Sequence, residues 1–420
     1  MAMKQLQLQY GGMQHGHQAA HVRMAADGPD FTAICDRIAE QLHAAKITQG
    51  TIPRELYEAT AGELMNAVFS GLGDRKTFAY EDPNNLLVAY LRQNIYAFSA
   101  AKSLKEMQVF NDLMIGDDGK IKPFTQFRND VTKAGKVFNI THLKTDYDTA
   151  LASTQIAQSF NEFADEDIIE VRSTGAENVC PVCGGLNGFT RPKSATIWAT
   201  LCPPFHPNCN CKLIPGVERN IKKHTDPKQM LKDAGVKPYF QSNPAISKVV
   251  FEKDYPYMDG LRRKSLNWQN GYNMQSLDRI YIDRWPTAKT VDTKAAANKW
   301  WAEQAGTAKG SFYAKDCFGS VLSFDNGFRN HVFEQNNEFR YLYVQNTIDI
   351  IADPDEVWSN KGADGKLRTV YLKYYDDFPY SIMVDDLQAF TLTRHRLSKK
   401  GEINATAVNN LRSGTLLFRK

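Results

Sequence analysis

The stretch from Cys180 to Cys211, CPVCGGLNGFTRPKSATIWATLCPPFHPNCNC, separates two parts of the chain that differ in character. It holds five of the seven cysteines of the protein, together with one histidine. Cys180 and Cys183 form a CxxC motif, and His206 and Cys209 repeat the same spacing further along. Zinc prefers four thiolate or imidazole ligands in a tetrahedron, and clustered cysteines in a reducing compartment are more often metal ligands than disulfides. The stretch therefore predicts a zinc site.

The choice of ligands leaves alternatives open. The four residues that we expect to bind zinc are Cys180, Cys183, His206 and Cys209. Cys211 is the substitute for Cys209, because one added dipeptide changes the reach of the chain only slightly, and Cys202 is a weaker candidate. A disulfide pair and unrelated buried thiols are the competing readings. Four protein ligands would close the site, so the ion is expected to stabilise the fold of this loop rather than to catalyse a reaction.

Residues 30–170, before this stretch, show the apolar spacing of helices. The segment 53–72 and the segment that follows EDPNN both carry such stripes, and the second ends at the turn signal GDDGK. Two more helices are expected over 124–138 and 142–164. Residues 1–28 lack this periodicity and are expected to form a mobile arm. The two stripes consist of Leu56, Leu64, Val68 and Leu72, and of Leu87, Leu91, Ile95 and Phe98.

The remainder of the chain favours strands and turns. DIIEVRST, residues 167–174, alternates like a strand that leads into the cysteines, and residues 217–291 are polar and aromatic, as in a connector with little regular structure. From residue 292 a helix is followed by short alternating segments, which predicts a small antiparallel sheet with helices on one face. The fold class is therefore α+β, with a mostly helical domain over 29–216 that ends in a zinc-knuckle-like loop and a smaller domain over 292–420. The expected strands of this smaller domain cover 368–375, 381–386, 388–397 and 415–420.

Composition narrows the class of protein only coarsely. The chain has 420 residues, 42% hydrophobic and 23% charged, which suits a globular protein of two or three domains. We find no apolar run long enough for a membrane span and no secretory signal in MAMKQLQLQYGGMQHGHQ, so an intracellular protein is expected. The net charge of +4 is too small by itself to indicate a nucleic-acid partner.

Several motifs in the first half resemble a known phage family. TDYDTALASTQIAQSFNEF, then VCPVCGGLNG, then PPFHPNCNC follow the order seen in the phage minor head proteins typified by the F protein of phage Mu. LRQNIYAFSAAKSLKEM and DDGKIKPFTQF extend the similarity, which covers residues 60–216. Asn210 stands where that family commonly has arginine in HPNCRC, and it is not a proposed ligand.

This resemblance implies a role in phage head morphogenesis. It implies a minor capsid protein that acts near the portal vertex, with portal and capsid proteins and phage DNA as partners. The expected location is the virion, or the host cytoplasm during assembly.

Residues 310–420 are similar to the nuclease-like domains of the barnase, EndoU, colicin E5/D and RelE type that are often fused to phage head proteins. The similarity rests on FRNHVFEQ with His331, on the helix-like YLYVQNTIDIIADPDEVW and on the short strands after it. Domains of this type cleave RNA without a metal ion, through attack of the 2′-hydroxyl on the adjacent phosphate. The resemblance implies an RNA substrate here, and an alternative identity as a toxin-like ribonuclease encoded by a phage or prophage.

If that chemistry operates here, His331 is the expected general acid or base, because an imidazole titrates near neutral pH. Lys373 and Arg394 are expected to stabilise the phosphate, and Thr391 or Thr393 to orient it. Two-residue alternation puts the threonines on one face of their strand and Arg394 in the opposite phase, so all of them line one site only if the strand twists or bulges. The competing readings are a surface histidine and solvated charges. A zinc-dependent nucleic-acid reader fits less well, because the loop between the knuckles offers only Arg191 and Lys193 as cations.

Overall fold

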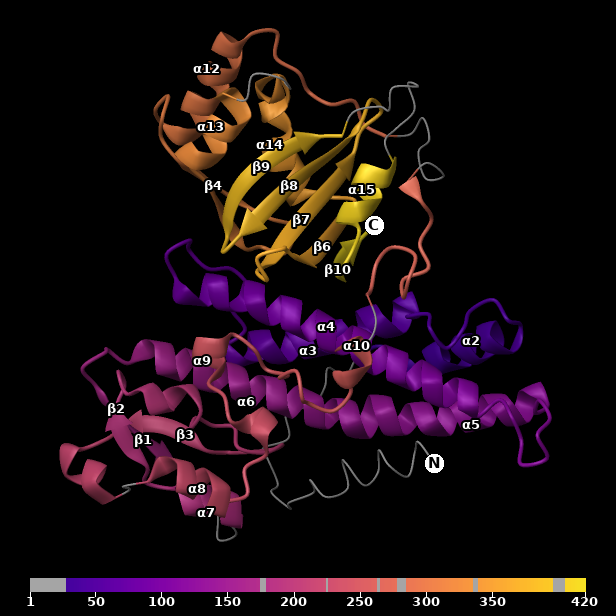
Figure 1. The fold of residues 1–420 in the computed structure, drawn as a ribbon, viewed down its shortest axis with the longest axis vertical. Helices are drawn as coiled ribbons and strands as arrows, with labels where there is room; N and C mark the ends of the chain where they lie inside the picture. Colours follow the sequence, from indigo (N-terminus) through magenta and orange to yellow (C-terminus); the bar gives the residue numbers. More distant parts are fainter. Residues whose placement is uncertain are drawn as a thin grey trace. The chain divides into compact units, whose positions relative to one another are not determined.

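The computed structural model describes residues 28–173, 179–223, 226–262, 265–277, 285–334, 339–395 and 405–420. The expected amino-terminal arm, except for its last residue, lies outside these ranges. The chain separates into two compact units (Figure 1), which are described in turn. The first consists of Met1–Arg75 with Ala97–Lys264, and the second of Lys76–Tyr96 with Ser265–Lys420. None of the helices in the described ranges combines the length and the hydrophobicity that a bilayer span needs.

The first unit begins with a group of packed helices, as the apolar stripes predict. All eight stripe residues from Leu56 to Phe98 are buried, which confirms the prediction of core-facing helices. Helix α3 packs on α6 and α2 packs on α5. Between α5 and α6 the backbone continues as one turn of π-helix at Val137–His142. The helices are α2 (Phe31–His43), α3 (Arg54–Gly71), α4 (Pro83–Asp112), α5 (Phe124–Lys136) and α6 (Leu143–Glu162), and α4 contributes its first turns to the second unit.

A small antiparallel sheet in the order β2-β1-β3 is formed by strands that lie before, within and directly after the cysteine-rich stretch. Its central strand β1 (Ile168–Arg172) is the strand that DIIEVRST predicts. The partners β2 (Thr190–Pro192) and β3 (Lys212–Pro215) lie inside the stretch and directly after it, and the short helix α7 (Pro181–Leu186) follows the first cysteine. The sheet therefore brings the two ends of the cysteine-rich stretch together.

The expected connector is divided between the two units. Residues up to 264 belong to the first unit and those from 265 to the second. The part in the first unit has only short elements and is held by aromatic packing: Phe251 stacks on Phe98 of α4, with ring centroids 3.8 Å apart. These elements are η3 (Glu218–Lys223), α8 (Pro227–Asp233), η4 (Pro238–Phe240), α9 (Pro244–Ser247) and α10 (Asp259–Arg262).

The second unit is built on a seven-stranded sheet in the order β10-β6-β7-β8-β9-β5-β4. The strands expected from alternation are present, but the sheet is mixed, because β5 and β9 pair in parallel through Ser323 and Gln388. The strands are β4 (Phe312–Lys315), β5 (Val321–Phe324), β6 (Glu356–Lys361), β7 (Leu367–Tyr374), β8 (Pro379–Asp385), β9 (Gln388–Arg394) and β10 (Thr415–Arg419).

Helices precede, interrupt and follow these strands. Helix α13 packs on β9, and α14 packs on β7 and β8. The helix expected over 341–358 is shorter than predicted: α14 stops at Ala352, and β6 begins at Glu356 beyond Pro354, which cannot donate the hydrogen bond that a helix needs. The helical elements are α12 (Lys294–Ala305), α13 (Asn326–Glu334), the 3-10 turn η5 (Arg340–Asn346), α14 (Thr347–Ala352) and α15 (Ala405–Leu411).

Candidate functional site

The two cysteines of the CxxC motif are positioned by the start of helix α7. Cys180 is the N-cap residue, and its Sγ accepts a hydrogen bond from the backbone N–H of Cys183 at 3.4 Å. Pro181 occupies the first turn, where its missing N–H costs no hydrogen bond. The motif therefore folds locally so that both sulfur atoms face the same side.

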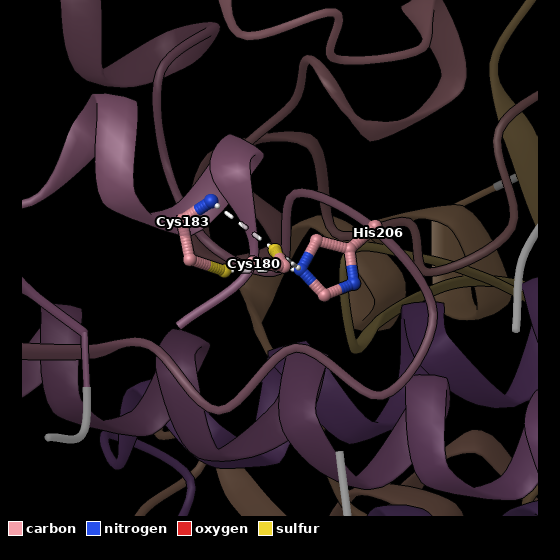
Figure 2. A group of neighbouring side chains, drawn as sticks. All are labelled: Cys180, Cys183 and His206. Carbon is pink, nitrogen blue, oxygen red and sulfur yellow. Dashed lines mark hydrogen bonds between the residues drawn. The ribbon is translucent and has the colours of Figure 1, made fainter. Parts of the chain in front are cut away.

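His206 lies against both sulfur atoms of this motif (Figure 2). Its Nε2 is 3.1 Å from Sγ of Cys180 and 3.0 Å from Sγ of Cys183. Sγ of Cys183 is also 3.7 Å from Sγ of Cys209. The ligand atoms of Cys180, Cys183 and His206 lie within 4.8 Å of one another, and so do those of Cys183, Cys209 and Cys211. The structure therefore brings together all five of the first-choice and substitute ligands.

A hydrogen bond at the other ring nitrogen of His206 fixes the orientation of the imidazole. Nδ1 lies 2.7 Å from the backbone carbonyl oxygen of Pro207, which can only accept a hydrogen bond. Nδ1 therefore donates this hydrogen bond, and Nε2 faces the sulfur atoms. Metal-binding histidines are commonly oriented in this way by a carbonyl on the far nitrogen.

The set of donor atoms fits zinc. The five side chains are all buried, and thiolate with imidazole is the donor set of structural zinc sites. Hydrogen bonds from Cys183 and Cys211 lower the pKa of the Cys209 thiol well below its usual value. The hydrogen bond with Cys209 raises the pKa of the Cys183 thiol, so without an ion only one of these two sulfur atoms is favoured as the thiolate that binds metal. Burial raises the pKa of the Cys202 thiol, and Cys202 belongs to neither of the two groups.

A second cluster lies where helix α13 packs beside strand β9. Nε2 of His331 is 2.8 Å from Oγ1 of Thr391, and a guanidinium nitrogen of Arg340 reaches both, at 3.2 Å from Thr391. Because a guanidinium only donates hydrogen bonds, Nε2 of His331 must be an acceptor in this arrangement. The imidazole of His331 therefore faces both a hydroxyl group and a positive charge.

The cluster continues along one face of the sheet. Oγ1 of Thr393 is 3.4 Å from Oγ1 of Thr391, and the cross-strand partner of Thr393 is Ser381. Directly paired residues of antiparallel strands point to the same face. Oγ of Ser381 is 2.8 Å from Nε2 of His395, so a second imidazole lies at the Thr393 end of this row.

The structure does not bring Lys373 or Arg394 to this face. Lys373 pairs with Tyr380 across β7 and β8, and Tyr380 pairs with Arg394, so these three side chains share the opposite face, which is packed into the core. Nζ of Lys373 is 2.8 Å from a carboxylate oxygen of Asp353. The guanidinium of Arg394 lies 3.7 Å from the centroid of the Phe378 ring. Strand β9 has a bulge at Phe390, but this bulge does not place Arg394 on the face that carries Thr391 and Thr393.

Comparison with known families identifies the part of the chain that holds this cluster. Residues 301–419 match the family model described as phage-Barnase-EndoU-ColicinE5/D-RelE like nuclease2. The carboxyl-terminal part is therefore similar to this phage nuclease-like domain. No curated protein and no solved structure matched the chain. The family match does not include residues 60–216, so the resemblance of the first half to phage head proteins stays a prediction.

The sequence pattern did not single out Arg340, and it indicated no role for Ser381 or His395. Arg340 is separated from Thr391 by 51 positions, and no local spacing marks it. Ser381 and His395 become candidates only through strand register, which the alternating pattern does not specify. The nuclease-like domain thus places several polar groups along one face of the sheet. They are the imidazoles of His331 and His395, the hydroxyl groups of Ser381, Thr391 and Thr393, and the guanidinium of Arg340.

Proposed function

We propose that the carboxyl-terminal domain cleaves RNA without a metal ion, through attack of a ribose 2′-hydroxyl on the adjacent phosphorus. The observation that carries the proposal is the contact of His331 with Thr391 and Arg340, which combines a proton acceptor, a hydroxyl and a fixed positive charge. The family match supports a nucleic-acid substrate. The choice of RNA rests on the resemblance and on the chemistry of these side chains.

In the proposed reaction His331 takes the proton from the 2′-hydroxyl. The 2′-oxygen then forms a bond to phosphorus, and the bond from phosphorus to the 5′-oxygen breaks with its electron pair on that oxygen. The products are a 2′,3′-cyclic phosphate and a 5′-hydroxyl. We assign the proton that reaches the 5′-oxygen to His395, and the stabilisation of the negative charge that develops on the phosphate to Arg340.

Thr391 and Thr393 are assigned the orientation of the phosphate oxygens by their hydroxyl groups. Lys373 and Arg394 are left out of the mechanism, because both are engaged on the opposite face of the sheet. Arg340 takes the role that the sequence had suggested for them.

The test is RNA cleavage by the full-length protein, with transfer RNA and total RNA as substrates and a chelator present. We expect wild-type protein to produce cyclic phosphate ends, and His331→Ala to lower the rate by about 10²–10⁴-fold, the range for loss of a general base or acid. Tyr313→Ala on β4 is the matched control and should cleave like wild type. Equal cleavage by wild type and His331→Ala would remove His331 from the mechanism, and no cleavage by wild type would refute the enzymatic proposal.

For residues 29–216 we propose, as a second function, the phage head role that the resemblance implies. The proposal is supported by the resemblance of the motifs around Cys180–Cys211 to phage head proteins and by the match of residues 301–419 to a phage nuclease-like family. The protein would then be a minor component of the phage head, in the virion or in the host cytoplasm during assembly. Affinity purification of the full-length chain from phage-producing cells should recover portal protein, and its absence at every stage of assembly would argue for a free toxin-like ribonuclease.

A further inference from the structure

Two exposed phenylalanines directly precede the two residues that His331 contacts. Phe339 comes before Arg340 and is 55% exposed, and Phe390 comes before Thr391 and is 37% exposed. Single exposed apolar side chains are common on protein surfaces, so the significance of this pair lies in its position beside polar groups that converge.

Strand β9 has a bulge at Phe390. Val384 pairs with Ala389 and Met383 pairs with Thr391, so Phe390 is the extra residue without a partner on β8. Bulges next to active sites change the direction of a side chain. The bulge thus allows Phe390 and the next residue, Thr391, to lie on one face of the sheet.

A contact with Arg368 shows which face Phe390 occupies. The guanidinium of Arg368 lies 5.6 Å from the centroid of the Phe390 ring. Arg368 and Val370 are two positions apart on β7, so their side chains point to the same face of the sheet. Val370 pairs with Met383 on β8, and Met383 pairs with Thr391 on β9. The Phe390 ring therefore lies on the same face of the sheet as Thr391.

Phe339 has an unusual backbone conformation. Its φ is 45° and its ψ is 39°, in the left-handed region that a bulky aromatic residue rarely adopts. Residues held in such conformations cluster at ligand-binding sites. The next residue, Arg340, starts η5 and directs its guanidinium to His331 and Thr391. The residue in the left-handed conformation therefore lies directly before the residue whose side chain reaches the site.

We propose that Phe339 and Phe390 are stacking surfaces for unpaired bases on either side of the cleaved phosphate, so that the substrate is single-stranded RNA. This proposal rests on the proposed ribonuclease function. Aromatic rings bind splayed bases through their flat faces, with little dependence on sequence, whereas bases inside a duplex are stacked on one another and cannot reach such rings. Arg340 and Arg368 supply positive charge beside the rings, although Arg368 is also paired with Asp364 and Asp385.

The test measures binding rather than cleavage. Full-length His331→Ala protein is titrated into a fluorescein-labelled unpaired RNA of mixed sequence, with anisotropy as the readout. Adding Phe390→Ala or Phe339→Ala should weaken binding about tenfold each, equal to about 1.4 kcal/mol per ring. Phe390→Trp should retain the affinity. The same RNA annealed to its complement should bind weakly, and equally in all variants.

Two controls separate stacking from other effects. Tyr313→Ala removes an aromatic side chain of similar exposure from β4 and should leave the affinity unchanged. Phe339→Gly removes the ring while relieving the left-handed strain, so it should lose RNA affinity without loss of thermal stability. Unchanged affinity in both Phe→Ala variants, or equal affinity for duplex and unpaired RNA, would overturn the proposal.

The outcome can be told apart from failure of the ribonuclease itself. If wild-type protein cleaves RNA but cuts single strands and duplexes equally, the stacking proposal fails and the ribonuclease proposal stands. If wild-type protein cleaves neither, while the phenylalanine variants still weaken binding of unpaired RNA, the domain binds RNA through these rings without cleaving it.

Discussion

Glu106 is a carboxyl group buried inside the helices of the first unit. Burial raises its pKa to about 7, an effect that the nearby Lys102 reduces without removing. Its Oε2 accepts a hydrogen bond from the side-chain amide of Asn139 at 2.9 Å, while Lys102 is paired with Asp146 at 3.0 Å. The carboxyl group binds a proton more tightly in the folded protein than in the unfolded chain, where its pKa has the ordinary value of 4.5. The contribution of Glu106 to the free energy of unfolding must therefore fall as the pH rises from 4.5 to 7.

Glu106→Gln removes this titration while keeping an oxygen that can accept the bond from Asn139. We expect the variant to unfold at higher temperature than wild type at pH 8, by an amount that corresponds to about 2–3 kcal/mol, and to differ little at pH 5. Thermal unfolding of both proteins at the two pH values is the measurement. His142, whose burial lowers its pKa to about 3, is unchanged in both proteins, so its opposite pH dependence cancels in the comparison. A variant that is less stable than wild type at pH 8 would show that the carboxylate is stabilised in the fold.

At the scale of elements, a buried ion pair connects the residue that follows helix α15 to strand β6. The guanidinium of Arg412 lies 2.8 Å from Oε2 of Glu356, and both side chains are buried. Nε1 of Trp358 donates to the same carboxylate oxygen. Removal of one member of such a pair leaves a buried charge without its partner, and this is strongly destabilising.

Arg412→Met should therefore lower the free energy of unfolding of the second unit by about 3–5 kcal/mol. The double variant Arg412→Met with Glu356→Gln should recover a large part of that loss, because it removes the unpaired charge and keeps an acceptor for Trp358. Lys366→Met, in an exposed pair with Asp385, is the control and should change stability by about 1 kcal/mol or less. Urea denaturation provides the values. A loss as small as that of the control would mean that the buried pair does not hold α15.

The elements also show what the sequence could reveal. The helices were predictable because Leu56 and its stripe have one buried face, and β7 to β9 because their residues alternate. Strand β6 was mistaken for the end of a helix because it begins at Glu356, directly after the short segment that follows the end of α14 at Ala352. Burial does not distinguish it, because β7 and β8 also have four or more consecutive buried residues. The buried cluster of cysteines and His206 was predictable because the CxxC and HxxC spacings are local. Arg340 was not, because only the packing of η5 beside β9 brings it to Thr391.

At the scale of the whole molecule, the two candidate sites belong to different units. The residues from Cys180 to Cys211 lie in the first unit, and His331, Arg340 and Thr391 lie in the second. Structural zinc contributes on the order of 10 kcal/mol of binding free energy to the fold that it holds. Loss of the metal should therefore weaken the first unit and leave the chemistry of the second intact.

Cys183→Ser tests this separation, because Cys183 is the residue common to both groups of potential ligands. Wild-type protein should contain about one equivalent of zinc, and the variant less than half of that by elemental analysis. Its first unit should unfold at lower temperature and become sensitive to protease, while the rate of RNA cleavage per folded second unit stays within about twofold of wild type. Cys317→Ser changes a cysteine outside the two groups and should keep the zinc. Cleavage that falls in proportion to the zinc content would contradict a purely structural metal. Loss of a structural ion from the first unit should not by itself change the proton transfers assigned to His331 and His395 in the second.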